Sequence, residues 1–215
     1  MHKKVMVVLV FVISVYSLYA GEVSKKVKDQ AMSLYEETAK TVFSSEITQI
    51  KPRIVSSKLG EFCKPYKFFL VGIPVPERMR TSMTPAVIFY KIVSADKVFP
   101  VNGAKEIAVF LTEFKKPVSE EEDVMVLVSI FAEMLNAKIR TDMPEKKSII
   151  KKYMDQKPEN WKFVISKTES GWKSFVTLMI HSDIEYCIRY ALEFSREGKI
   201  SVLNENDIYS YTLYE

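Results

Sequence analysis

The segment from His181 to Glu185 carries the side chains best suited to proton transfer. It reads His-Ser-Asp-Ile-Glu, and its histidine is the only one apart from His2. An imidazole oriented by the carboxylate of Asp183 or Glu185 can act as a general base, as in a small hydrolase or isomerase. Ser182 is a poor nucleophile for this base, because neighbouring residues of an extended chain face opposite ways. Such polar residues also form ordinary loops between strands, and a loop is what we expect here.

Cys63 and Cys187 are the only cysteines of the chain. With so few histidines they cannot supply a zinc site of the usual cysteine and histidine composition, and no glycine-rich phosphate loop is found. The sequence therefore predicts no metal and no cofactor. In an oxidising compartment an isolated cysteine pair is expected to form a disulfide. That bond would close a loop of about 124 residues, and two separate thiols are the alternative.

A proline-rich segment, residues 73–85, contains our candidate binding residues. It reads IPVPERMRTSMTP and has neither helical nor strand periodicity. Connections of this length inside a compact domain are often functional. Arg78 and Arg80 can bind an anionic group, whereas Met79 and Met83 can supply adaptable apolar contacts. The alternative is a structural arm packed over a sheet edge.

Residues 1–20 predict a signal peptide. Two lysines precede an apolar run from Val5 to Ile13, and Ala20 offers a small residue before a cleavage site. We expect cleavage after Ala20, which leaves a mature chain of residues 21–215 without a stable membrane span, periplasmic or secreted. An uncleaved anchor is the alternative, although the 16 residues from Val5 to Ala20 are slightly fewer than a span of about 17 to 25 requires.

The charge of the chain argues against nucleic-acid binding. The net charge of +4 falls to +2 when Lys3 and Lys4 leave with the signal peptide, too little for an electrostatic attraction to phosphates. A hydrophobic content of 47% excludes a disordered chain. The expected partner is therefore an unknown protein or a small apolar or anionic ligand.

The hydrophobic pattern predicts an α+β fold with curved antiparallel sheets and packed helices. Helical periodicity is found at residues 23–43, from Ser119 to Leu135, and after Pro144 to about Gln156. Strand-like runs occupy residues 66–71, 86–93, 97–101, 106–114, 161–167, 172–180, 186–195, 199–203 and 208–214. We expect Ser119 to cap the second helix in a capping box with Glu122.

The two blocks of predicted strands share a weak internal similarity. Phe89-Tyr90-Lys91-Ile92 resembles Arg189-Tyr190-Ala191-Leu192 in pattern, which favours a degenerate tandem repeat. Each copy would be a helix-on-sheet unit of the cystatin or nuclear-transport-factor type, an analogy of architecture only. Residues 21–215 then form one domain, with two intimately packed halves, 21–116 and 117–215, as a further possibility. One shared sheet and two separate sheets remain alternatives.

Aromatic residues are concentrated in the last block of strands. They are Trp161, Trp172 and the tyrosines at positions 186, 190, 209, 211 and 214. Aromatic side chains favour strands for packing reasons alone, but a concave sheet lined by them can also hold an apolar ligand. We therefore expect an exported, non-enzymatic binding protein that acts through segment 73–85 or through the aromatic sheet face.

Overall fold

The computed structural model describes residues 49–74, 77, 87–95, 97–142, 158–181 and 184–212. The chain divides into two compact units, Met1–Pro100 and Val101–Glu215. Both contain antiparallel sheets and helices, so the predicted α+β class is confirmed. The predicted signal peptide, the helices at 23–43 and 144–156, and all four candidate binding residues, Arg78, Met79, Arg80 and Met83, lie outside the described residues.

The described helices were also compared with the requirements of a membrane span. Within the ranges given above, none of them is both long enough and apolar enough to cross a bilayer.

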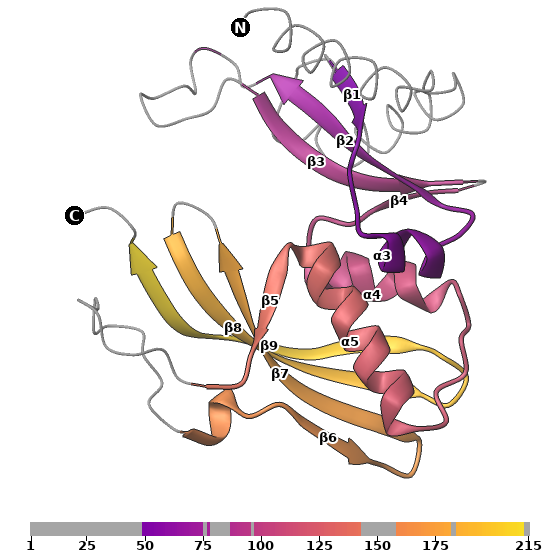
Figure 1. Ribbon diagram of the computed structural model, residues 1–215, viewed down its shortest axis with the longest axis vertical. Coiled ribbons are helices and arrows are strands. Elements are labelled where there is room, and N and C mark those ends of the chain that lie inside the picture. Colours follow the sequence, from indigo (N-terminus) through magenta and orange to yellow (C-terminus); the bar gives the residue numbers. More distant parts are fainter. Residues whose placement is uncertain are drawn as a thin grey trace, which may run out of the picture. The chain divides into compact units, whose positions relative to one another are not determined.

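The first unit is built on a four-stranded sheet (Figure 1). Its elements are β1 (Gln49–Pro52), α3 (Ser57–Phe62), β2 (Lys67–Pro74), β3 (Val87–Ser94) and β4 (Val98–Pro100). The strands follow the order β1-β2-β3-β4, each antiparallel to its neighbour. Phe69, Val71 and Ile92 form a buried cluster on one face, against which Ile50 and Val98 pack. Three of these strands match the runs predicted at 66–71, 86–93 and 97–101.

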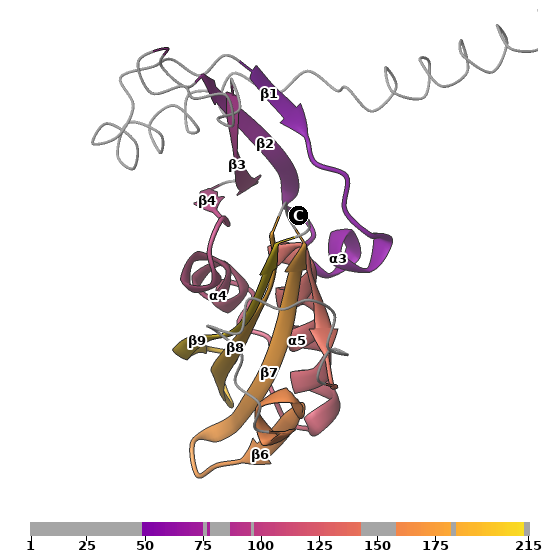
Figure 2. The same ribbon diagram turned by 90° about the vertical axis from the view of Figure 1, so that its left-hand side faces the viewer.

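The second unit is a five-stranded sheet with two helices (Figures 1 and 2). Its elements are α4 (Ala104–Thr112), α5 (Glu121–Leu135), β5 (Ala137–Arg140), the 3-10 helix η3 (Pro158–Trp161), β6 (Val164–Lys167), β7 (Gly171–His181), β8 (Ile184–Ser195) and β9 (Ile200–Thr212). The order is β5-β7-β8-β9, and β6 pairs with the other half of the β7 edge. Helix α4 packs on β9, whereas α5 packs on β5 and β7. The described residues thus form two sheets and not one.

Residues 106–114 do not form the predicted strand, because residues 106–112 belong to α4 and residues 113 and 114 form the turn after it. The uninterrupted apolar run from Ile107 to Leu111 suits a buried helix as well as a strand with two covered faces. Buried residues at positions 104, 107, 108 and 111 have helical spacing. The Glu106 carboxylate also accepts hydrogen bonds from the backbone N–H groups of Asn102 (2.7 Å) and Gly103 (3.2 Å), which fixes the start of the helix.

The predicted helix from Ser119 to Leu135 is confirmed as α5, but its capping box is shifted by one residue. The helix begins at Glu121, so its third residue is Asp123 and not Glu122. Asp123 Oδ2 accepts from the backbone N–H groups of Ser119 (2.9 Å) and Glu120 (3.1 Å) and from the Ser119 hydroxyl (3.0 Å). Asn136 ends the helix in the left-handed conformation, with φ of 59°.

The sheet of the second unit has two distinct faces. Tyr190 of β8 packs edge-on against Phe131 of α5, with 5.6 Å between ring centroids, so its face is the one that the helices cover. On the opposite face, Arg189 donates hydrogen bonds to the backbone carbonyls of Asn160 and Lys162 and to the Thr177 hydroxyl. These bonds hold η3 against that face. Neighbouring residues of β8 thus face opposite sides of the sheet, as in a regular strand.

Candidate functional site

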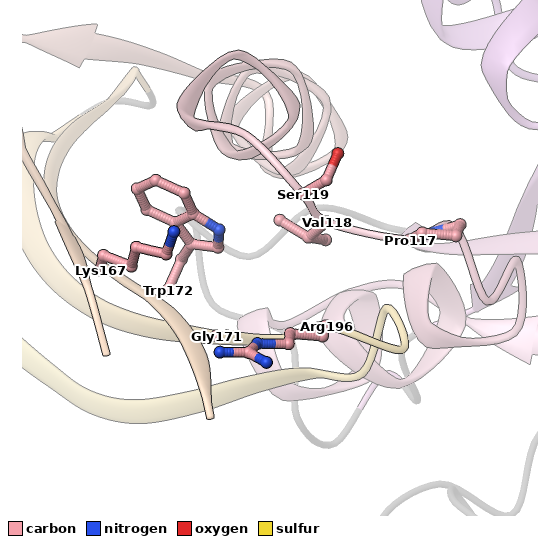
Figure 3. A pocket seen from close by; sticks show the side chains of 7 residues that line it. All are labelled: Pro117, Val118, Ser119, Lys167, Gly171, Trp172 and Arg196. Atoms are coloured by element: carbon pink, nitrogen blue, oxygen red, sulfur yellow. The ribbon is translucent and has the colours of Figure 1, made fainter. Parts of the chain in front are cut away.

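A pocket of about 370 Å³ lies at one end of the second sheet (Figure 3). We call it the Trp172 pocket. Its walls come from three connections, namely the loop between α4 and α5, the β6–β7 hairpin, and the turn after β8. The lining residues are Pro117, Val118, Ser119, Lys167, Gly171, Trp172 and Arg196.

Backbone contacts hold these three connections together. The N–H of Val118 donates to the carbonyl of Arg196 (3.3 Å), which joins the α4–α5 loop to the end of β8. The N–H of Arg196 donates in turn to the carbonyl of Ser170 in the β6–β7 hairpin (3.4 Å). A Cβ atom on Gly171 would lie 3.0 Å from Ser195 Cα and closer still to the Phe194 carbonyl. The chain therefore needs glycine where β7 starts, because the backbones approach too closely for a side chain.

Lys167 and Trp172 face each other across the β6–β7 hairpin. They are direct partners in the strand register, and the ammonium lies 5.6 Å from the centroid of the indole. Val118 points toward the indole from the α5 side, whereas the Ser119 hydroxyl points away from the pocket (Figure 3). The pocket thus combines a half-buried aromatic ring with a fully buried valine and two exposed cations, those of Lys167 and Arg196.

Two carboxylates close to the lining residues in sequence, those of Asp123 and Glu197, are engaged in capping and turn contacts. The backbone N–H groups of Ser119 and Glu120 lower the pKa of Asp123. A hydrogen bond with its own backbone, followed by one with the Ser195 hydroxyl, lowers the pKa of Glu197. Neither residue lines the pocket. The charges on its wall are therefore those of a lysine and an arginine.

This arrangement suits binding better than catalysis. The wall offers cations, an indole and one hydroxyl, and that hydroxyl is donated to Asp123. Within the described ranges, no group of three or more histidine, cysteine, aspartate or glutamate residues is placed to hold a metal ion. Lys167 and Arg196 can hold an anionic group, and Trp172 can stack on a flat apolar one.

The predicted catalytic residues lie at the other end of β7. His181 and Glu185 are direct register partners where the β7–β8 hairpin closes, whereas Asp183 lies outside the described residues. Their proposed roles in proton transfer stay a prediction. The first two residues of segment 73–85 end β2, and Pro74 is the register partner of Val87, the first residue of β3.

Both cysteines are buried, and neither carries a disulfide bond in the structure. Cys63 caps the C-terminal end of α3 in the first unit, and Cys187 lies on β8 in the second. The predicted bond between them stays a prediction. Comparing the intact mass before and after reduction tests it.

Local sequence patterns did not identify most of the pocket. Trp172 was among the predicted aromatic residues of the sheet, but Pro117, Lys167 and Arg196 were not singled out. They are far apart in the sequence, and strand register with two turns brings them together. The clearest local signal was the Glu169-Ser170-Gly171 turn directly before the tryptophan.

Comparison of the whole chain with protein-family models, with curated proteins and with solved structures finds no match.

Proposed function

We propose that this protein is an exported, non-enzymatic binding protein and that the Trp172 pocket is its ligand site. The observation that carries the proposal is the half-buried indole of Trp172, which lines a pocket of about 370 Å³ together with Val118 and two cations. Pockets for small molecules have volumes of about 300 to 1,000 Å³ and combine apolar walls with few polar groups. The pocket lies within this range of volumes, and its lining combines the apolar Trp172, Val118 and Pro117 with two cations and a hydroxyl.

The experiment measures the intact mass of the protein purified from its own host. We would recover it under non-denaturing conditions and compare its mass before and after denaturation. A small-molecule mass that is lost on denaturation supports the proposal and identifies the ligand by weight. A chain that starts at Gly21 would support export as well.

The matched variants are Trp172→Ala and Phe175→Ala. Both remove an aromatic side chain from β7, but Phe175 does not line the pocket and instead lies under Lys173 and Arg189. We expect only Trp172→Ala to lose the bound mass. A wild-type protein that carries no extra mass, or a Trp172→Ala protein that keeps it, would overturn the proposal.

A small hydrolase or isomerase is the second candidate. The register pairing of His181 with Glu185 favours it, because it places a histidine and a glutamate opposite each other at the end of one hairpin. General acid–base catalysis typically contributes about a hundredfold or more to the rate. A hydrolytic or isomerase activity that His181→Ala retains in full would exclude this role.

A further inference from the structure

We infer that the ligand of the Trp172 pocket is a small planar organic anion, of the aromatic carboxylate class. This inference rests on the proposed function and adds the chemistry of the ligand. Three features of the pocket carry it, namely its cations, the position of Lys167 over the indole, and its size.

The cations of the pocket are available to a ligand. Both side chains are exposed, and among the described residues neither lies within 4.0 Å of a carboxylate oxygen. The charge of Arg196 does help to lower the pKa of the adjacent Glu197, so Lys167 is the cation with no such neighbour. The only hydrogen bond of the Arg196 guanidinium within the described chain runs from Nη2 to the carbonyl of Glu169 (3.2 Å). Its remaining N–H groups and the Lys167 ammonium can donate to a carboxylate, and such charge-assisted hydrogen bonds are the stronger kind.

The position of Lys167 disfavours a cationic ligand. A tryptophan in a pocket often attracts cations through the face of its ring. Here the Lys167 ammonium already lies 5.6 Å from the indole centroid, so a second cation beside the ring would meet a like charge. A carboxylate beside this ammonium gains an ion pair, and the flat group that carries it can pack on the indole and Val118.

The size of the pocket limits the ligand to one or two rings. A volume of about 370 Å³ is near the lower end for small-molecule sites. The ligand is therefore smaller than a dinucleotide or a lipid tail.

The test uses 2-naphthoate and its neutral analogue 2-naphthamide as probes. They share size and ring system, and they differ in charge. Binding to the purified protein is measured by calorimetry and by the NMR signal of the Trp172 indole N–H, which the variant Trp172→Phe assigns. We expect naphthoate to bind about tenfold more tightly than naphthamide, as one charge-assisted hydrogen bond implies. The advantage should shrink as salt is added, because both cations are exposed.

The variants separate the pocket from general surface charge. Lys167→Ala combined with Arg196→Ala should abolish the preference for naphthoate. The control combines Lys162→Ala with Lys199→Ala, which removes the same net charge from two exposed lysines outside the pocket and should keep the preference.

Two other outcomes of the binding experiment would overturn the inference. Equal binding of both probes would refute the anionic ligand and leave the proposed function standing. Failure of both probes to shift the Trp172 signal would refute the aromatic carboxylate class. The proposed function fails separately, when the protein from its host carries no small molecule or the Trp172→Ala protein keeps it.

Discussion

Gly198 lies directly against the backbone of Lys116. A Cβ atom at Gly198 would lie 2.8 Å from the Lys116 nitrogen and nearer still to its carbonyl oxygen, and φ at Gly198 is 87°. The β8–β9 turn therefore packs on the loop that precedes α5, next to the Trp172 pocket. Only glycine satisfies both the conformation and the close contact.

We predict that Gly198→Ala lowers the free energy of unfolding by at least about 2 kcal/mol, because it adds left-handed strain and a backbone clash. Denaturant unfolding measures the change. Gly60→Ala is the matched control, since Gly60 lies within α3 and its added Cβ would meet only Val55 Cγ2 at 3.8 Å. That variant should gain about 0.5 to 1 kcal/mol. Equal effects of the two substitutions would show that the contact with Lys116 is unimportant.

The carboxylate of Asp123 should make the stability of α5 depend on pH. Backbone N–H groups of Ser119 and Glu120 bind its ionised form and lower its pKa from 3.8. A group with a lowered folded pKa stabilises the protein above its unfolded pKa, and this contribution is lost as the pH falls through the folded pKa. Asp123→Asn should therefore cost about 1 kcal/mol at neutral pH and progressively less below about pH 4.

Thermal unfolding of wild type and Asp123→Asn across this pH range provides the measurement. Glu121→Gln is the control, because Glu121 shares the first turn of α5 but is not its third residue. A stability difference that persists unchanged at low pH would mean that the ionised carboxylate of Asp123 is not what caps the helix.

Local sequence patterns predicted most elements of the fold because burial follows their periodicity. Tyr190 and Arg189 are neighbours in the strand predicted at residues 186–195, and their contacts with Phe131 and Asn160 lie on opposite faces, as a strand requires. The prediction of a strand at residues 106–114 was wrong because the periodicity there carries no information. Each residue from Ile107 to Leu111 is apolar, so the helical spacing of the buried positions was hidden in a continuous run.

The last strand shows a second limit of local patterns. Residues 199–203 and 208–214 were predicted as separate strands, with the polar residues 204–207 between them. In the structure β9 is continuous, and its register with β8 shifts beside Leu192 and Ile188. The polar residues Asn204 and Glu205 pair with β8 and are exposed. Pairing with a neighbouring strand stabilises such a segment, and its own composition does not report that pairing.

Arg189 should hold η3 in place, and the solvent exposure of Trp161, the last residue of η3, shows whether it does. The indole of Trp161 is only 1% exposed, and Arg189 Nη1 donates to the carbonyl of Lys162 (3.1 Å) as well as to that of Asn160. We predict that Arg189→Ala releases this segment and exposes Trp161, at a cost of about 2 to 3 kcal/mol for hydrogen bonds that involve a charge.

The measurement is acrylamide quenching of fluorescence in a Trp172→Phe background, where Trp161 is the only tryptophan. Arg189→Ala should increase quenching and shift the emission to the red. Lys173→Ala is the control, because Lys173 also lies over Phe175 and belongs to β7. If both variants quench alike, η3 is held by contacts other than those of Arg189.

Two hydroxyl groups on β7 should respond in opposite ways to removal. Ser174 is fully buried, and its Oγ has no hydrogen-bond partner among the described residues. Thr177 is equally buried, but its Oγ1 donates to the carbonyl of Asn160 (2.7 Å) and accepts from Arg189 (3.2 Å). A buried hydroxyl without a partner carries its full desolvation cost, whereas removing a bonded one leaves its partners unsatisfied.

We therefore predict that Ser174→Ala raises the free energy of unfolding by about 1 kcal/mol and that Thr177→Val lowers it by about 1 to 2 kcal/mol. Urea unfolding of the two variants and the wild type, with unchanged slopes, measures both. A loss of stability in Ser174→Ala would contradict the prediction that its buried hydroxyl carries an uncompensated desolvation cost. Ser174 and Thr177 lie on opposite faces of the same strand but are equally buried, so the opposite signs are expected from their hydrogen bonding.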